Sequence, residues 1–218
     1  MPNRDSSKVE QLRQHYQSDI LSIDNTANNP LDQFESWFND ALESGILEPN
    51  AMTLCTVSPQ GYPQGRIVLL KGFSEEGFRF FTNYGSSKGN DLKHNPRASL
   101  VFFWDKLQRQ VRISGPVEKL SEEASSAYFN KRPVESQLGA IASPQSQVIP
   151  SRKVLSDSLE QAKLDHQSTQ KITKPKHWGG YLVMPTTYEF WQGQPSRLHD
   201  RIVYHKEENK WTKSRLAP

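Results

Sequence analysis

Near the end of the chain, the stretch RLHDR at residues 197–201 places two arginines and a histidine at every second position. Successive side chains of a β-strand point to opposite faces, so Arg197, His199 and Arg201 would share one face. Leu198 would then pack inward on the other face, and the sequence leaves the partner of Asp200 open. Two permanently charged guanidinium groups beside an imidazole that titrates near neutrality can bind anions and hold or move a proton.

A second group of polar residues lies in TNYGSSKGN, at residues 82–90. Thr82, Ser86, Ser87 and Lys88 occur there where a predicted strand leads into a predicted helix. The first turn of a helix offers free backbone N–H groups and the positive end of the dipole, which together favour a phosphate. Such a stretch is equally typical of a capped helix on a solvated loop. It therefore indicates a phosphate site only in combination with other features.

A third group lies in YFNKRPVES, where Tyr128 and Arg132 are one helical turn apart and Ser136 follows shortly after. The fork-shaped guanidinium donor suits a second phosphate, although a solvated helix end explains the same residues. Trp191 could stack on an aromatic ligand or fill the core.

The strand RIVLLK carries Arg66 and Lys71 at its two ends. These residues are five positions apart, so an ideal strand directs them to opposite faces. Both can reach one ligand only if the strand is bulged, if it ends near the site, or if one side chain reaches around.

Composition excludes several classes of protein. The 218 residues include 27 Lys and Arg against 24 Asp and Glu, and no dense basic block that would indicate nucleic-acid binding. The single cysteine, Cys55, excludes an internal disulfide, fits a reducing compartment and is expected to be a buried small apolar residue. A polar N-terminus and the absence of a long apolar stretch predict a cytoplasmic protein without a membrane span. Scattered histidines and the absence of HExxH argue against a metal site.

The elements that must position these residues are mainly strands. Apolar runs separated by turn residues predict strands at 51–57, 64–71, 77–83, 97–104, 109–115, 179–185, 187–192, 197–205 and 210–216. Helices are predicted at 5–19, from Asn29 and Pro30 to a stop near Gly45, and at 86–94, 119–132 and 151–165. Closely spaced strands favour antiparallel pairing. The expected fold class is α+β, mainly β: one domain over 1–218, a β-barrel with peripheral helices. Its helical N-terminal segment covers 1–45, and a polar connection covers 166–177.

Taken in order, RIVLLKGF, FFTNYGSSKG, RQVRISG, YFNKRPVESQLGA, SPQSQ, HWGGY, EFWQGQPSRLHDR and RLAP resemble the FMN-dependent pyridoxine (pyridoxamine) 5′-phosphate oxidases. The resemblance runs from about Arg13 to Pro218. It implies an antiparallel Greek-key split β-barrel that binds FMN at a homodimer interface. It also implies oxidation of pyridoxamine 5′-phosphate and pyridoxine 5′-phosphate to pyridoxal 5′-phosphate in vitamin B6 biosynthesis and salvage. Dioxygen would be reduced to hydrogen peroxide, and ammonia would leave from the amine.

The resemblance also implies the site residues. FMN would contact Arg66, Ile67, Val68, Leu69, Leu70, Lys71, Phe81, Thr82, Ser87, Lys88, Gln110, Gln145, Ser146, Trp191 and Arg201. Substrate phosphate would be held by Lys71, Tyr128, Arg132 and Ser136, with Arg13 and Tyr16 closing over the site as a lid. Arg197 and His199 would flank the pyridine ring as the catalytic residues. Because arginine stays protonated, Arg197 would clamp the substrate and stabilise developing charge, and His199 is the better candidate for a hydrogen-bond or proton role.

Two positions depart from the family pattern: Ser87, where a basic residue is frequent, and Phe81, where tyrosine is frequent. Two other functions also fit parts of the sequence. A flavin- or F420-linked reductase of the same fold would bind FMN but leave the substrate residues without a purpose, namely Tyr128, Arg132, Ser136, Arg197 and His199. A flavin or pyridoxal-phosphate carrier would bind without oxygen-dependent turnover.

Overall fold

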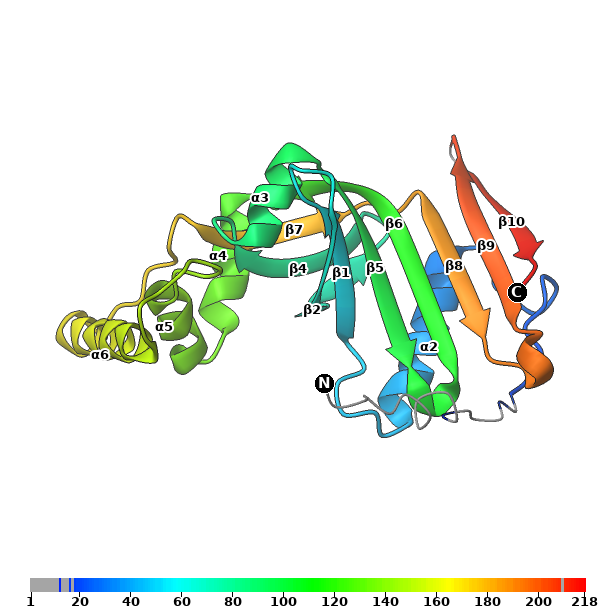
Figure 1. Ribbon diagram of the computed structural model, residues 1–218, viewed down its shortest axis with the longest axis horizontal. Helices are drawn as coiled ribbons and strands as arrows, with labels where there is room; N and C mark the ends of the chain where they lie inside the picture. The colour runs from blue at the N-terminus through cyan, green and yellow to red at the C-terminus, as the bar shows by residue number, and fades with distance from the viewer. Residues whose placement is uncertain (1–11, 13–15, 17, 209) are drawn as a thin grey trace, which may run out of the picture. The chain divides into compact units, whose positions relative to one another are not determined.

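The computed structural model describes residues 12, 16, 18–208 and 210–218, and it divides into two compact units (Figure 1). The first unit contains the described residues up to Pro49, residues 103–111 and residues 188–218. The second contains residues 50–102 and 112–187. Strands β5 (Arg97–Trp104) and β6 (Arg109–Lys119) contribute residues to both units. The single domain expected over 1–218 stays a prediction.

The first unit is built from helix α2 (Pro30–Glu43) and strands β8 (Thr187–Gln192), β9 (Asp200–Glu207) and β10 (Lys210–Leu216). The three strands are neighbours in the order β10-β9-β8 (Figure 1). As predicted, Asn29 caps α2 by accepting a hydrogen bond from the Leu31 N–H, and Pro30 opens the helix. The apolar face of α2 is buried, and Trp37 meets Phe190 edge to face at 5.3 Å. This aromatic contact joins the helix to the sheet within the core of the unit.

The second unit contains strands β1 (Ala51–Val57), β2 (Pro63–Leu69), β3 (Gly72–Ser74), β4 (Gly77–Asn83) and β7 (Trp178–Val183). Antiparallel pairs join β1 to β2 and β5, and join β4 to β3 and β7. Residues alternate between buried and half-buried along β1, as the predicted period of two requires. Fully buried Leu54, Phe78, Phe80 and Leu100 fill the core.

Four helices belong to the second unit: α3 (Ser87–His94), α4 (Glu122–Lys131), α5 (Val134–Ala142) and α6 (Arg152–Thr169). Ser86 caps α3 and Ser121 caps α4, each by accepting a bond from the N–H three residues ahead. Helix α5 was not predicted, and it packs beside α6 (Figure 1). Helix α6 continues to Thr169, so the polar connection expected over 166–177 begins only after that residue.

The structure corrects the interpretation of RLHDR as one strand. A short 3-10 turn, η2 (Pro195–Arg197), precedes an irregular Leu198 and His199, and β9 begins at Asp200. Ser196 and Arg197 both adopt positive φ, which interrupts the alternation that a strand would impose. Leu198 is 70% exposed instead of packed inward. The helix predicted at 5–19 lies almost entirely outside the described residues, and Ser18 and Asp19 are not helical.

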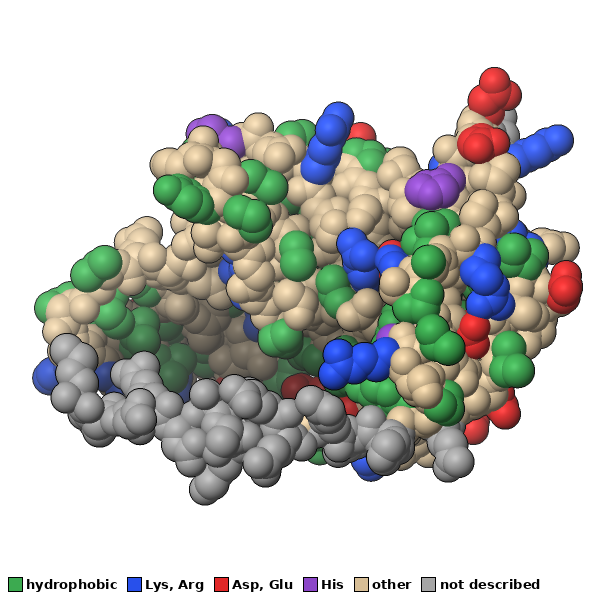
Figure 2. Space-filling view, turned by 45° about the vertical axis from the view of Figure 1, so that its right-hand side comes forward, with side chains coloured by type: hydrophobic (Ala, Val, Ile, Leu, Met, Phe, Trp, Pro, Cys, Tyr) green, Lys and Arg blue, Asp and Glu red, His purple; other side chains and the backbone are tan. Residues whose placement is uncertain are grey.

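The hairpin formed by β9 and β10 carries exposed charges of both signs at its tip (upper right in Figure 2). Exposed Lys206 and Glu207 lie at the end of β9, with Lys210 at the start of β10.

Among the described residues, no helix has the length and apolar character needed to cross a membrane.

Candidate functional site

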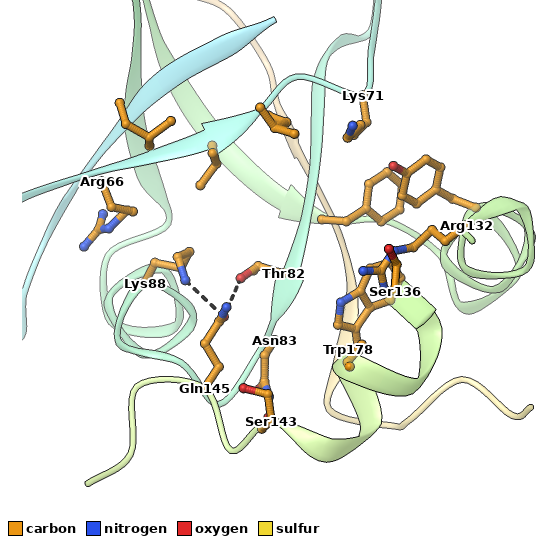
Figure 3. A pocket seen from close by; sticks show the side chains of 17 residues that line it. Arg66, Lys71, Thr82, Asn83, Lys88, Arg132, Ser136, Ser143, Gln145 and Trp178 are labelled. Atoms are coloured by element: carbon orange, nitrogen blue, oxygen red, sulfur yellow. Dashed lines mark hydrogen bonds between the residues drawn. The ribbon is translucent and has the colours of Figure 1, made fainter. Parts of the chain in front are cut away.

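A cavity of about 570 Å³ opens in the second unit (Figure 3). Its wall contains most of the residues predicted to bind FMN or the substrate phosphate. The predicted residues that line it are Arg66, Ile67, Val68, Leu69, Lys71, Phe81, Thr82, Lys88, Tyr128, Arg132, Ser136 and Gln145. They come from β2, β4, α3, α4 and α5, from the connections that follow β2 and α4, and from the loop after α5. The fold thus brings into one cavity side chains that are as far as 79 positions apart in the sequence, from Arg66 to Gln145.

Both Arg66 and Lys71 line this cavity because β2 ends at Leu69. The backbone N–H of Lys71 donates to Arg79 O at 2.8 Å, outside the β1–β2 ladder. The alternation that would separate the two side chains therefore stops before Lys71. Leu70 is 4% exposed and packs into the core instead of lining the cavity.

Lys88 lies at the N-terminal end of α3 and is 8% exposed. Its ammonium donates to Ser86 Oγ at 3.2 Å and to Gln145 Oε1 at 3.1 Å, and Thr82 Oγ1 donates to the same Gln145 oxygen at 3.0 Å (Figure 3). Burial lowers the pKa of Lys88, and the nearby Arg66 charge lowers it further. The ammonium is thus held by neutral acceptors in a place that disfavours its charge, and an anion would stabilise it.

Arg66 is arranged differently. Its guanidinium donates to Asp91 Oδ2 at 3.3 Å, to Thr56 Oγ1 at 2.6 Å and to Leu54 O at 3.1 Å. Asp91 is itself 4% exposed and also accepts from Thr56. Arg66 therefore has a carboxylate partner within the protein, and it fixes β2 against α3 as well as lining the cavity.

Arg132 follows the last residue of α4, and its side chain points into the cavity (Figure 3). Its Nη1 atom is buried and has no hydrogen-bond partner among the residues that the structure describes, and burial lowers the pKa of the guanidinium. The group lies 4.8 Å from the centre of the Trp178 ring. Tyr128 lies beside it, and burial raises the pKa of the phenol while the Arg132 charge partly offsets this. Ser136 completes this end of the cavity.

Three predicted cofactor residues of the second unit lie outside the cavity lining: Leu70, Ser87 and Ser146. Ser87 is exposed at the first position of α3, and Ser146 is exposed with a φ of 69°. Phe81 does line the cavity, and its ring stacks on Tyr128 with 3.9 Å between ring centres. At the two positions that depart from the family pattern, the serine thus faces solvent and the phenylalanine contributes its ring.

Tyr16, Trp191 and His199 form an aromatic cluster in the first unit. Tyr16 meets Trp191 and His199 edge to face, with ring centres 5.8 and 5.6 Å apart. The backbone N–H of Gln194 donates to His199 Nδ1 at 3.0 Å. Burial and the Arg197 charge lower the pKa of His199. The ring is therefore neutral at pH 7, with Nδ1 as acceptor and the proton on Nε2.

The remaining predicted residues of the first unit have different surroundings. Arg197 is exposed in the left-handed region with a φ of 63°. Arg201 donates to Glu189 through Nε and Nη2, both at 3.0 Å, so this guanidinium has a carboxylate partner. Gln110 is half-buried in β6. Arg13 lies outside the described residues.

Asp200, whose partner the sequence left open, is 8% exposed and satisfied by two groups. Its Oδ2 accepts from the Leu21 N–H at 3.0 Å, and its Oδ1 accepts from Arg215 Nη1 at 2.5 Å. Arg215 also donates to Leu21 O. Asp200 therefore attaches the segment around Leu21 to strands β9 and β10.

The sequence reasoning did not assign a role to five residues that also line the cavity. They are Asn83, Gly139, Ala140, Ser143 and Trp178. Trp178 occurs in HWGGY, a stretch that contributes to the family resemblance, so its aromatic character was visible although its position was not. Within the described residues, His, Cys, Asp and Glu form no group of three or more that could hold a metal ion.

Comparison with protein families gives two matches that together cover most of the chain. Residues 38–164 match the model described as pyridoxamine 5′-phosphate oxidase. Residues 178–218 match the model described as the pyridoxine 5′-phosphate oxidase C-terminal dimerisation region.

Curated relatives cover nearly the full chain. Pyridoxine/pyridoxamine 5′-phosphate oxidase of Salinibacter ruber is 50% identical over 214 residues, which is 97% of this chain and 100% of the relative. The protein of the same name from Gloeothece citriformis is 53% identical over 211 residues, covering 96% and 98% of the two chains.

Solved structures support the predicted fold class. The structure of PhzG from Burkholderia lata, in complex with tetrahydrophenazine-1-carboxylic acid, matches with a TM-score of 0.85 and 26% identity over 92% of this chain and 99% of that chain. A pyridoxamine 5′-phosphate oxidase-related, FMN binding protein from Nostoc punctiforme matches with a TM-score of 0.68 and 19% identity over 85% and 97% of the two chains. These matches confirm an antiparallel split β-barrel with peripheral helices. From the family models and the curated relatives, the chain is an oxidoreductase that belongs to the pyridoxamine 5′-phosphate oxidase family.

Proposed function

We propose that this protein uses FMN and dioxygen to oxidise pyridoxamine 5′-phosphate and pyridoxine 5′-phosphate to pyridoxal 5′-phosphate. The observation that carries the proposal is the presence of two cationic groups, Lys88 and Arg132, that lack a carboxylate partner among the described residues and line one cavity. A desolvated cation is costly without an anion, so two such groups favour two phosphates. FMN and the substrate carry one phosphate each.

The residues present fit FMN at the end of the cavity near α3. Lys88, the Thr82 hydroxyl and the Gln145 amide would hold its phosphate, with the N-terminus of α3 adding a positive dipole end. When bound, FMN supplies a hydride acceptor for the C4′ carbon of the substrate. Because Ser87 faces solvent, we expect it to contribute little to this phosphate contact.

The residues at the other end fit the phosphate of the substrate. Arg132 would present its unsatisfied Nη1–H, with the Tyr128 and Ser136 hydroxyl groups as further donors and Lys71 as a second cation. Anchoring the phosphate fixes the position of the pyridine ring, which is an orientation effect on the rate.

His199 would act as a hydrogen-bond donor through Nε2. Its Nδ1 lone pair is already occupied by the Gln194 N–H, so the neutral ring has no free acceptor and cannot take up a proton without losing that bond. Of the two roles that the sequence left open for His199, the geometry therefore favours the hydrogen bond over proton transfer. Arg197 would clamp the substrate as a permanent cation. Its left-handed backbone is a strained conformation of the kind that occurs at functional sites.

The proposed reaction balances with dioxygen as oxidant. Pyridoxamine 5′-phosphate, O₂ and water give pyridoxal 5′-phosphate, ammonia and H₂O₂, whereas pyridoxine 5′-phosphate and O₂ give pyridoxal 5′-phosphate and H₂O₂. We further propose a cytoplasmic homodimer, supported by the match of residues 178–218 to a dimerisation region and by the single cysteine. Tyr16, and Arg13 outside the described residues, would form the lid.

An aerobic assay of the FMN-loaded protein tests the proposal. We expect stoichiometric pyridoxal 5′-phosphate and peroxide from both phosphorylated substrates, and much slower turnover of pyridoxamine, which lacks the phosphate. Binding of FMN without turnover of either substrate would instead indicate a carrier or a reductase. The PhzG complex raises the prospect of an unphosphorylated carboxylic acid as substrate. A guanidinium binds a carboxylate as well as a phosphate, so the slower turnover of pyridoxamine than of its phosphate is the result that would favour a phosphate ester.

A further inference from the structure

Arg132 differs from four other described arginines, which form ion pairs, in what surrounds its guanidinium. Arg66, Arg109, Arg201 and Arg215 each pair with a carboxylate. Arg132 has no ion pair among the described residues and lies instead over two aromatic rings, 4.8 Å from the centre of Trp178 and 5.8 Å from that of Phe129. Among the described residues, the hydrogen bonds of Arg132 involve its backbone: its N–H donates to Phe129 O, and its carbonyl oxygen accepts from Gln137 Nε2 at 2.8 Å.

Trp178 is the common contact of the groups around this end of the cavity. Its ring is nearly parallel to Phe81 and Tyr128, at interplanar angles of 13° and 6°, and it meets Phe129 edge to face. It is 6% exposed, at the first position of β7, and it lines the cavity. Tyr128, Phe81 and Trp178 thus form parallel layers beside Arg132.

The neighbouring sequence makes this arrangement possible. Gly180 lies opposite Phe81 in the β4–β7 ladder, and a Cβ at Gly180 would lie 2.7 Å from the Phe81 ring. Glycine at this position therefore allows the Phe81 ring to lie over β7, within reach of Trp178 and Tyr128.

We infer that Trp178 is a positioning residue that orients Arg132 for the substrate phosphate. A carboxylate would also orient the guanidinium, but it would neutralise the charge and compete with the phosphate. An aromatic face restrains the cation without supplying a counter-ion, so the full charge and the fork-shaped donors remain for the ligand. This inference rests on the proposed function, because it takes the phosphate of a vitamin B6 compound as the ligand of Arg132.

The test measures how much the phosphate of the ligand contributes to binding. Pyridoxal 5′-phosphate and pyridoxal are titrated separately into the FMN-loaded protein by calorimetry, and the ratio of their dissociation constants is the phosphate increment. Trp178→Leu removes the ring face, whereas Trp178→Phe keeps one. We expect the phosphate increment of the leucine variant to be roughly tenfold smaller than that of the wild type, which is the size of a desolvated cation–π contact. The phenylalanine variant should recover most of the increment.

Two further variants separate positioning from a general structural effect. In the Arg132→Ala background, Trp178→Leu should cause no additional loss, because the group that it positions is absent. Trp211→Leu is the matched control, since Trp211 also lies near a cation, Lys206 at 6.0 Å, but belongs to β10 and does not line the cavity. It should leave the increment unchanged.

Each outcome has one meaning. Equal increments in wild type and Trp178→Leu, or an equal loss with and without Arg132, would overturn the positioning role. A wild-type protein that binds pyridoxal 5′-phosphate no better than pyridoxal would instead overturn the proposed substrate phosphate site, whatever Trp178 does.

Discussion

Replacing Lys88 with methionine should separate two consequences of burying a cation: lower stability of the FMN-free protein and tighter binding of FMN. Methionine keeps the length and apolar stem of lysine but removes the charge. Within the described part of the chain, the Lys88 ammonium donates only to the neutral acceptors Ser86 and Gln145, and burial lowers its pKa from the usual 10.5. In the FMN-free protein the charge is therefore a cost, whereas with FMN bound it would meet a phosphate.

The expected loss of FMN affinity follows from the strength of one charged hydrogen bond. A hydrogen bond from a charged donor contributes about 1.5–3 kcal/mol, which corresponds to an increase of about 10- to 150-fold in the dissociation constant of FMN when it is lost. Riboflavin, which lacks the phosphate, should lose much less. The FMN-free Lys88→Met protein should unfold at a higher temperature than wild type. Because the pKa is lowered on folding, the wild-type penalty is fully present at neutral pH and is relieved as the pH rises toward 10.5, and the variant should lack this pH dependence.

Quenching of flavin fluorescence measures both affinities, and thermal unfolding of the FMN-free protein measures stability. Lys93→Met is the control, because Lys93 lies exposed in the last turn of the same helix. The reasoning would be refuted if Lys88→Met bound FMN as tightly as the control, or if it weakened riboflavin and FMN equally.

Two further substitutions test the first unit. His199→Gln can still place an amide N–H where the imidazole has Nε2–H, so it should retain more activity than His199→Asn. The lowered pKa of His199 keeps the wild-type ring neutral above pH 6.5, so kcat/KM of the wild type should stay level at neutral pH and fall only below that value. Steady-state kinetics against pH measure both effects, and equal losses in the two variants would contradict the donor role. Asp200→Asn should reduce the free energy of unfolding, measured in urea, by about 2 kcal/mol, because it weakens the bonds to Arg215 and Leu21. Glu207→Gln, at the exposed end of the same strand, should have little effect on that free energy. Equal stabilities of the two variants would argue against this role for Asp200.

Local sequence patterns predicted the bounds of helices and strands well where capping residues, turn residues and the hydrophobic period were all present. Asn29 with Pro30 marks the start of α2 at the predicted position, and α4, which Ser121 caps, lies within the predicted range 119–132. Strands β4 and β5 follow the predicted ranges 77–83 and 97–104. In these segments the caps, turn residues and hydrophobic period all indicate the same structure.

The prediction failed at RLHDR because alternation of residue types does not establish a strand. Ser196 and Arg197 adopt positive φ, which no short-range pattern of these residue types requires. The partners of Asp200 were equally out of reach, since Leu21 lies 179 positions away. Contacts of this kind depend on the complete fold.

For the cavity, the resemblance supplied residues that periodicity alone could not bring together. Gln145, which the resemblance implies as a cofactor residue, bonds to Thr82 of β4, 63 positions away. Trp178, to which the sequence assigned no role, stacks on Phe81 of the same strand. The opposite behaviour of two arginines, Arg66 paired with Asp91 and Arg132 unpaired over Trp178, also becomes visible only in three dimensions. That difference in pairing is why the substrate phosphate is proposed to bind Arg132.

The most direct test of the proposed function is a single turnover without oxygen. FMN-loaded protein is mixed anaerobically with one equivalent of pyridoxamine 5′-phosphate while the visible absorbance of the flavin is recorded. The account predicts that the flavin is bleached as pyridoxal 5′-phosphate forms, that air restores the colour with release of peroxide, and that unphosphorylated pyridoxamine reacts far more slowly. A flavin that stays oxidised with pyridoxamine 5′-phosphate, in protein shown to bind both molecules, would contradict it.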